Sequence, residues 1–146
     1  MATLLETAIA MAVAGHSGQV DKADQPYILH PLRIMMRVRG ETLRIVAVLH
    51  DLVEDTATTF ADLRQAGFST EVIEALEHLT HQEDEDYESY IVRVKGNELA
   101  RHVKLRDLED NMDIRRLNHV PSERDWKRLR KYRLAWSVLN DLPEGG

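Results

Sequence analysis

The stretch "LRIVAVLHDLVED" (residues 43–55) joins an apolar core pattern to a cluster of side chains that handle protons and metals. On one continuous helix, at about 100° per residue, an arc of about 140° would hold the four polar side chains His50, Asp51, Glu54 and Asp55. The aliphatic side chains would fill the opposite side and pack into a core. The sequence therefore predicts a buried helix with one face that carries an imidazole and three carboxylates.

This polar face has two interpretations. Neighbouring carboxylates raise one another's pKa and weaken a helix unless another charge compensates them. A divalent cation would do so, because imidazole and carboxylate are common ligands of such ions. The alternative is an exposed polar helix face with an incidental histidine. A metal site therefore needs further ligands from elsewhere in the chain.

Two other segments offer such ligands. "PYILHP" (residues 26–31) places His30 directly before a proline that is expected at the first position of a helix. "KLRDLEDNM" (residues 104–112) places Asp107 and Asn111 four residues apart, on one face of a helix. The order His, His-Asp, Asp over three distant segments predicts one site to which all three contribute.

Helical periodicity continues over nearly the whole chain. Start and stop signals predict about eight helices, within residues 4–16, 31–40, 41–52, 58–67, 69–80, 86–96, 97–112 and 122–140. Capping boxes are expected at Thr59–Asp62 and Ser122–Asp125. No pair of alternating β-type runs flanks a turn signal. We therefore expect an all-α fold, as a single domain over residues 1–146.

Composition narrows the function classes. The net charge of −6 argues against general binding to nucleic acid. No apolar run approaches the length of a membrane helix. The absence of cysteine excludes disulfides and thiolate metal sites and fits a cytoplasmic protein. Trp126, Tyr132 and Trp136 are expected in the core or in a contact between copies of the chain, so a homo-oligomer stays open.

Charge is unevenly spread along the sequence. Residues 51–90 contain twelve acids and a single basic residue, whereas eleven of the nineteen basic residues fall within residues 101–133. Solvated helix faces would explain this pattern. A cationic wall that faces an anionic ligand, opposite a metal site, would explain it as well. The acidic segment "HQEDEDYESY" (residues 81–90) is correspondingly either a lid or a solvated loop.

The motifs together resemble a known family. "AGHSGQVDKADQPYILHP" (residues 14–31) is similar to AHxGQxRKxGxPYIxHP, "AVLHDLVEDT" (residues 47–56) to ALLHDxVEDT, and "KLRDLEDNM" to KLADxxxNM. These strings are typical of the HD superfamily of metal-dependent phosphohydrolases. They most resemble the hydrolase domain of RelA/SpoT homologues, in particular the small alarmone hydrolases, over about residues 5–140.

The resemblance implies a single Mn²⁺ held by four side chains, which are His30, His50, Asp51 and Asp107. It implies that Glu54 and Asp55 activate the attacking water and handle its proton, and that Asn111 contacts the substrate. The implied reaction removes pyrophosphate from the 3′ position of (p)ppGpp and leaves GDP or GTP. A donor set of nitrogen and oxygen without thiolate suits Mn²⁺ better than a structural zinc.

The chain departs from the family at one position. Asp21 stands where the family has an arginine that lies against guanine, whereas Lys22 is retained for substrate binding. Aspartate cannot stack as a guanidinium does, and it adds a negative charge. The substrate could therefore be another 3′-phosphorylated nucleotide, such as an adenosine analogue, or the base could be held differently. Arg115 and Arg116 are expected to supply phosphate contacts.

The sequence also bears on the role of His16 and on the choice between an enzyme and a non-catalytic binding protein. His16 belongs to the first motif and is expected to shape the cleft by hydrogen bonding rather than to bind metal. A non-catalytic nucleotide-binding regulator would need the ligands but not an acid–base pair. The presence of Glu54 and Asp55 therefore favours an enzyme.

Overall fold

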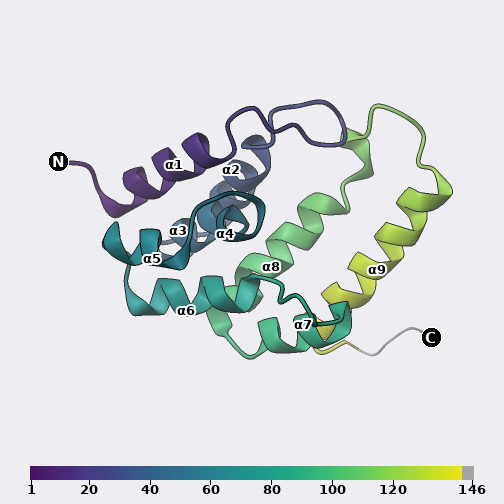
Figure 1. The fold of residues 1–146 in the computed structure, drawn as a ribbon. Coiled ribbons are helices and arrows are strands. Elements are labelled where there is room, and N and C mark those ends of the chain that lie inside the picture. The colour runs from purple at the N-terminus through teal and green to yellow at the C-terminus, as the bar shows by residue number, and fades with distance from the viewer. Residues whose placement is uncertain (143–146) are drawn as a thin grey trace.

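The computed structural model describes residues 1–142, which form an all-helical structure (Figure 1). The elements are α1 (Leu4–Gly15), α2 (Leu29–Met36), α3 (Glu41–Leu49), α4 (Leu52–Asp55), α5 (Phe60–Gln65), α6 (Thr70–Leu79), α7 (Tyr87–Lys95), α8 (Glu98–Asn111), the 3-10 helix η1 (Ile114–Arg116) and α9 (Glu123–Leu139). Within this part of the chain, extended pairing is limited to an isolated bridge between Val20 and Pro26. The predicted all-α class is confirmed.

Local capping explains where most helices begin. The predicted boxes are present, with Thr59 and Asp62 at the start of α5 and Ser122 and Asp125 at the start of α9. Further caps are Ser69 at α6, Asp86 at α7 and Asn97 at α8, where each side chain accepts a backbone N–H of the first turn. These oxygens satisfy donors that have no partner within the helix.

The predicted bounds of the second helix were wrong at both ends. α2 starts at Leu29, so Pro31 is its third residue, and it ends at Met36. Proline is tolerated there because the N–H groups of the first helical turn have no intrahelical partner. Gly40 does not end this helix but precedes α3, with a φ of 88° that favours glycine.

The prediction of one continuous helix through residues 43–55 was also wrong. α3 ends at Leu49, His50 is its C-cap, and Asp51 adopts φ −121° and ψ 10° before α4 starts. The Asp51 carboxylate is engaged by partners outside this segment: it accepts a hydrogen bond from Tyr27 and lies next to His16. These contacts of Asp51 come from distant parts of the chain. Helical periodicity considers one segment at a time and therefore does not predict the break between α3 and α4.

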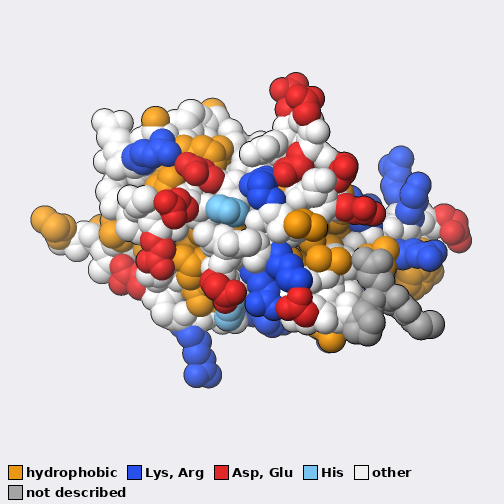
Figure 2. Space-filling model, turned by 90° about the horizontal axis from the view of Figure 1, so that it is seen from below, with side chains coloured by type: hydrophobic (Ala, Val, Ile, Leu, Met, Phe, Trp, Pro, Cys, Tyr) orange, Lys and Arg blue, Asp and Glu red, His pale blue; other side chains and the backbone are white. Residues whose placement is uncertain are grey.

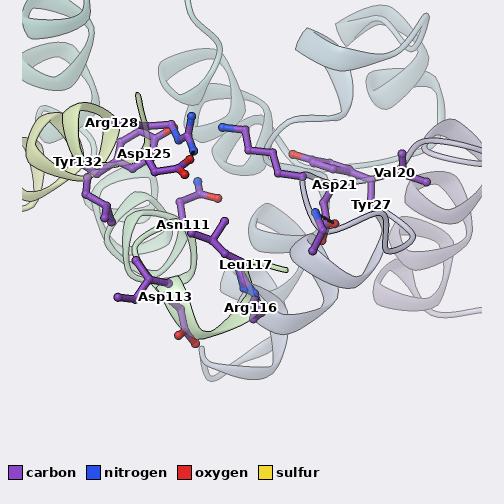
Figure 3. Close-up of a pocket in the computed structure, with 14 residues that line it drawn as sticks. Val20, Asp21, Tyr27, Asn111, Asp113, Arg116, Leu117, Asp125, Arg128 and Tyr132 are labelled. Carbon is purple, nitrogen blue, oxygen red and sulfur yellow. Dashed lines mark hydrogen bonds and ion pairs between the residues drawn. The ribbon is translucent and has the colours of Figure 1, made fainter. Parts of the chain in front are cut away.

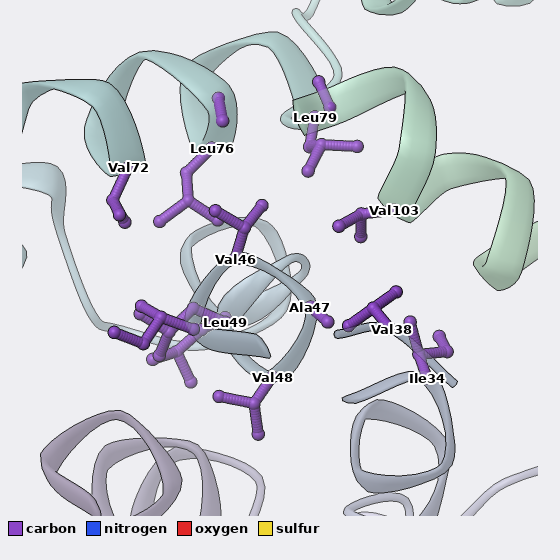
Figure 4. Packing of buried hydrophobic residues seen from close by; sticks show 14 of the residues in the cluster. Ile34, Val38, Val46, Ala47, Val48, Leu49, Val72, Leu76, Leu79 and Val103 are labelled. Carbon is purple, nitrogen blue, oxygen red and sulfur yellow. The ribbon is translucent and has the colours of Figure 1, made fainter. Parts of the chain in front are cut away.

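Two helices form the centre of the molecule. α3 packs against α1, α2, α6 and α8, and α8 packs against α2, α3, α6, α7 and α9. Every residue from Ile45 to Leu49 is buried. In Figure 4, Val46 and Leu49 point toward Val72 and Leu76 of α6, and Ala47 lies near Val38 and Val103. The apolar half of the 43–55 segment thus forms the core as predicted.

Among residues 1–142, no helix combines the length and the apolar composition that crossing a bilayer requires.

Candidate metal centre and adjoining cavity

Three side chains from α2, the end of α3, and α8 converge in the interior. His30, His50 and Asp107 are buried, and each offers one ligand atom within 4.8 Å of the other two. Nε2 of His30 is 2.9 Å from Oδ1 of Asp107, and Nε2 of His50 is 3.5 Å from the same oxygen. The packing of α8 against α2 and α3 thus brings together three of the four predicted metal ligands.

Hydrogen bonds orient both imidazole rings. Nδ1 of His30 lies 2.6 Å from Oδ2 of Asp110, and Nδ1 of His50 lies 2.7 Å from the carbonyl oxygen of Ala47. When Nδ1–H donates to these acceptors, a neutral ring presents the lone pair of Nε2. Both Nε2 atoms face Asp107, which is the arrangement that a metal requires of two histidine ligands.

Asp110 is itself held by two arginines, and the sequence reasoning missed this group. Arg33 donates from Nε to Oδ1 at 2.9 Å and from Nη2 to Oδ2 at 3.0 Å, while Nη1 of Arg116 lies 3.3 Å from Oδ1. Arg33 follows His30 by three residues and Asp110 follows Asp107 by three, so each lies on the ligand face of its helix. That spacing was the signal that could have identified them.

Asp51 lies at the edge of the three-residue group. Its Oδ2 is 3.6 Å from Nε2 of His50 and accepts a hydrogen bond from the hydroxyl of Tyr27. Its Oδ1 is buried without a well-formed hydrogen bond, although Nε2 of His16 lies 3.2 Å away. Burial and the negative charge of Asp51 raise the pKa of Tyr27, so its hydroxyl stays protonated and donates. The hydrogen bond of His16 is made by Nδ1, which lies 2.8 Å from Oε1 of Gln19.

Charge compensation keeps the buried acids ionised. Burial opposes ionisation of Asp107, but Nζ of Lys104, at 2.8 Å from Oδ2, and the two histidines hold its pKa well below the usual range. Burial also disfavours a charged His50, yet the carboxylates of Asp51 and Asp107 raise its pKa to about 9, so an ion that binds Nε2 would displace the proton of this ring. Ionised carboxylates are the form that binds metal ions.

Glu54 and Asp55, the predicted acid–base pair, line a pocket together with the candidate metal ligands. A pocket of about 160 Å³ is lined by Glu54 and Asp55 together with His30, His50, Asp51 and Asp107. Oε1 of Glu54 accepts a hydrogen bond of 2.7 Å from the backbone N–H of His81. Burial, together with the nearby charges of Asp51 and Glu54, raises the pKa of Asp55. A carboxylate with a raised pKa is better suited to accept and return a proton near neutral pH.

A larger cavity adjoins this pocket. It measures about 360 Å³ and shares Tyr27 and Asn111 with the smaller one (Figure 3). Basic lining comes from Lys22, Arg116 and Arg128, acidic lining from Asp21, Asp113 and Asp125, and apolar lining from Val20, Ala23, Ile114, Leu117 and Leu129. Its volume is in the range of small-molecule sites, and this mixture suits a ligand with an apolar ring and anionic groups.

Most predicted substrate residues line this cavity. Lys22 comes from the loop before α2, and burial together with the charge of Arg128 lowers its pKa. Asn111 ends α8 and donates from Nδ2 to Oδ1 of Asp107 at 3.1 Å. Asn111 therefore links the cavity directly to the candidate metal group.

The two neighbouring arginines face different ways. Arg116 lines the cavity, whereas the side chain of Arg115 is 87% exposed and pairs with Asp113 at 2.8 Å. The structure thus does not bring Arg115 to the cavity wall. Tyr132, which was expected in the core or in an oligomer contact, lines the cavity one turn after Arg128 on α9.

Asp21 has a structural role in the loop that borders the cavity. Its Oδ1 accepts from the backbone N–H of Ala23 at 2.8 Å and of Gln25 at 3.0 Å. This is the side-chain-to-backbone pattern by which aspartate stabilises turns. An arginine at position 21 could not accept these hydrogen bonds. The aspartate that stands in place of the family's arginine therefore stabilises the turn at residues 21–25.

The uneven spread of charge along the sequence had two interpretations, solvated helix faces or a cationic wall that faces an anionic ligand. On the face seen from below Figure 1, acidic side chains are spread around a central group of Lys and Arg (Figure 2). Other basic residues line the larger cavity. Acidic side chains on the surface and basic side chains in the cavity are therefore both present, although Asp21, Asp113 and Asp125 also line the cavity.

Sequence comparisons point to one group of proteins. No family model matches the chain. It is 28% identical over 161 aligned residues to the guanosine-3′,5′-bis(diphosphate) 3′-pyrophosphohydrolase of Aquifex aeolicus, covering 96% of this chain and 23% of that protein. It is 37% identical over 78 residues to the bifunctional (p)ppGpp synthase/hydrolase SpoT of Escherichia coli K12, covering 50% of this chain and 11% of SpoT. A GTP pyrophosphokinase of Myxococcus xanthus is 27% identical over 83% of this chain and 18% of its own length. The chain thus spans less than a quarter of the length of these relatives.

The fold is similar to that of a solved structure described as a metazoan ortholog of SpoT that hydrolyzes ppGpp. The TM-score is 0.75 at 18% sequence identity, with 95% of this chain and 86% of that chain covered. At this identity the likeness shows the fold. Together with the sequence matches, it confirms the resemblance of this chain to an HD-type hydrolase domain of the RelA/SpoT homologues.

Proposed function

We propose that this chain is a metal-dependent hydrolase that removes the 3′-pyrophosphate of (p)ppGpp and produces GDP or GTP and pyrophosphate. The observation that carries the proposal is the group of His30, His50 and Asp107 beside a cavity whose lining includes Lys22, Arg116 and Arg128. The names of the sequence relatives support the choice of substrate.

We assign the metal to Mn²⁺, held by His30, His50, Asp51 and Asp107. The donor set fits, because both Nε2 atoms face Asp107 and Oδ2 of Asp51 lies 3.6 Å from Nε2 of His50. When bound, the ion would supply Lewis acidity toward the phosphoryl oxygen and increase the acidity of a coordinated water.

Glu54 is the proposed general base. Its Oε1 is held by the N–H of His81, which leaves Oε2 to accept the proton of the attacking water. Asp55 borders the same pocket and would orient that water, while the proton taken up by Glu54 would be returned to the departing 3′ oxygen of the nucleotide. Lys104 adds a fixed positive charge at the pocket wall, where negative charge develops during phosphoryl transfer.

The larger cavity is the proposed nucleotide site. Lys22 and Arg116 would bind phosphate oxygens, since charge-assisted hydrogen bonds to phosphate are among the strongest available to a protein. Asn111 would contact the substrate at the junction of the two pockets. The cavity also makes Arg128 and Tyr132 candidates for substrate contacts. Substrate binding by Arg115 stays a prediction.

A second candidate keeps the chemistry and changes the base. Asp21 removes the guanidinium expected against guanine, and the cavity offers aliphatic side chains such as Val20, Ile114 and Leu117 instead. Aliphatic contacts do not distinguish guanine from adenine by hydrogen bonding. A 3′-pyrophosphorylated adenosine nucleotide is therefore the alternative substrate.

Product analysis tests both candidates. The protein is incubated with Mn²⁺ and either ppGpp or the corresponding adenosine compound, and the nucleotide and phosphate products are separated. We expect GDP and pyrophosphate from ppGpp, and no turnover by the Glu54→Gln variant. Release of single phosphate, or no product, rejects the proposal, and equal rates for both nucleotides favour the second candidate.

A further inference from the structure

Glu54 is fixed by a part of the chain outside the three motifs. The backbone N–H that it accepts belongs to His81, 27 residues away, in the segment between α6 and α7. Leu79 and Tyr90, which lie on either side of this segment, line the pocket that contains the candidate metal group. The position of the proposed base therefore depends on the backbone around residue 81.

Arg93 of α7 holds this backbone in place. Its guanidinium donates to the carbonyl oxygens of Glu77 at 3.0 Å, His78 at 3.1 Å and Thr80 at 2.8 Å. These carbonyls lie at the C-terminal end of α6, where carbonyl groups lack helical partners. Two further hydrogen bonds, of 2.7 and 2.8 Å, join Arg93 to the carboxylate of Glu85. The planar guanidinium of Arg93 thus connects the C-terminal end of α6 to Glu85, in the segment between α6 and α7.

Tyr90 supports the same backbone from the pocket side. Its hydroxyl donates to the carbonyl oxygen of Leu79 at 2.6 Å, and its ring contacts the ring of His81 at a centroid distance of 5.0 Å. The ammonium of Lys104 lies 5.2 Å from the centre of the Tyr90 ring. Residues 79–81 are therefore held by two side chains of α7, Arg93 at the carbonyl of Thr80 and Tyr90 at the carbonyl of Leu79.

We propose that the Arg93–Glu85 pair positions the His81 amide, and through it the carboxylate of Glu54, for proton abstraction. The inference rests on the proposed role of Glu54. A fixed amide restricts the carboxylate to one orientation and keeps one oxygen free for water. Arg93 and Glu85 contact neither the reacting atoms nor the nucleotide cavity, so both are positioning residues.

A proline substitution tests the amide itself. Thr80 has φ −92° and ψ 119°, a conformation that the residue before a proline adopts readily. His81→Pro removes the N–H, whereas His81→Ala removes the same ring and keeps the N–H. We expect kcat of His81→Pro to be about tenfold or more below that of His81→Ala, with KM and Mn²⁺ affinity within about twofold of each other. Equal kcat values overturn the proposal.

Variants of the pair provide the second test. Arg93→Ala and Glu85→Gln are expected to lower kcat with little change in KM, and Arg93→Lys should recover only part of the loss because it cannot make the two-pronged contact. Arg64→Ala is the matched control, since Arg64 makes an exposed ion pair with Glu77 of α6 at 3.0 Å. If Arg93→Ala and Arg64→Ala give the same kcat at a temperature where both are folded, the proposal fails.

Hydrogen exchange separates this inference from the proposed function. If the wild-type protein turns over no nucleotide, the proposed function fails, and exchange of the His81 amide still tests the contact. We expect slow exchange in the wild-type protein and faster exchange in Glu54→Ala, which removes the acceptor, and in Arg93→Ala. Unchanged exchange in both variants overturns the positioning role.

Discussion

Nε2 of His30 lies 2.9 Å from Oδ1 of Asp107, across a separation of 77 residues. The contact depends on α2 and α8 packing side by side, with the end of α3 against both. On the far side of the His30 ring, Nδ1 contacts Asp110. The three segments that carry the sequence motifs therefore meet at one point, and a second layer of side chains fixes the geometry there.

The first expectation concerns Asp110. Replacing it by asparagine removes the charged acceptor that orients His30, and second-layer partners of this kind typically contribute about 10- to 100-fold to metal affinity. Titration calorimetry with Mn²⁺ should show a loss of that size in Asp110→Asn. Glu109→Gln is the control, because Glu109 pairs with Arg106 on α8 at 2.5 Å instead. Equal affinity of the two variants would contradict the assignment.

The second expectation separates Arg116 from Arg115. Loss of a hydrogen bond to a charged group costs about 1.5–3 kcal/mol, so Arg116→Ala should raise KM roughly 10-fold or more. Arg115→Ala should change KM little, because its side chain is 87% exposed and pairs with Asp113. Steady-state kinetics on both variants decides the matter. A larger effect at Arg115 would restore the prediction made from the sequence.

The third expectation is a pH dependence of stability. Hydrogen bonds from Arg93 lower the pKa of Glu85 from 4.5 to about 2. Because the folded state favours the ionised carboxylate, the stabilisation is complete above pH 4.5 and is lost as the pH falls toward 2.

Urea denaturation from about pH 6 to about pH 3 measures this effect. The difference in free energy of unfolding between the wild-type protein and Glu85→Gln should be constant above pH 4.5 and shrink below it. A difference that stays constant over the whole range would show that the Arg93–Glu85 pair contributes nothing to stability.

The fourth expectation concerns the contact between α1 and α4. A Cβ atom added at Gly15 would lie 2.5 Å from Cδ1 of Leu52, which is fully buried and follows Asp51. Gly15→Ala should therefore reduce the free energy of unfolding by about 1–3 kcal/mol through overpacking. Ser17→Ala, at an exposed neighbour, should stay within about 0.5 kcal/mol of the wild-type protein. Equal stability of the two variants would contradict this packing.

The helical class and several caps could be predicted because they depend on local patterns, whereas the meeting of the three segments was predicted from the metal-binding residues that they carry. The capping oxygens of Thr59, Ser69 and Ser122 act within one turn of their own helix. The continuous apolar run at residues 45–49 likewise predicts a buried segment.

The remaining features depend on tertiary contacts that one segment does not encode. The break after His50 accompanies contacts of Asp51 with Tyr27 and His16. Which of two adjacent arginines faces the cavity depends on the 3-10 helix after α8, which was not predicted from the sequence although Asp113 caps it. The partners of Asp110 become evident only once α2 and α8 are known to pack together.

The central claim is that His30 and His50 bind one metal ion together, and pulsed electron paramagnetic resonance on the Mn²⁺-loaded protein tests it most directly. The account predicts one bound Mn²⁺ with hyperfine coupling to two imidazole nitrogens, and to a single one in His30→Ala or His50→Ala. A bound ion without imidazole coupling in the wild-type protein would contradict it.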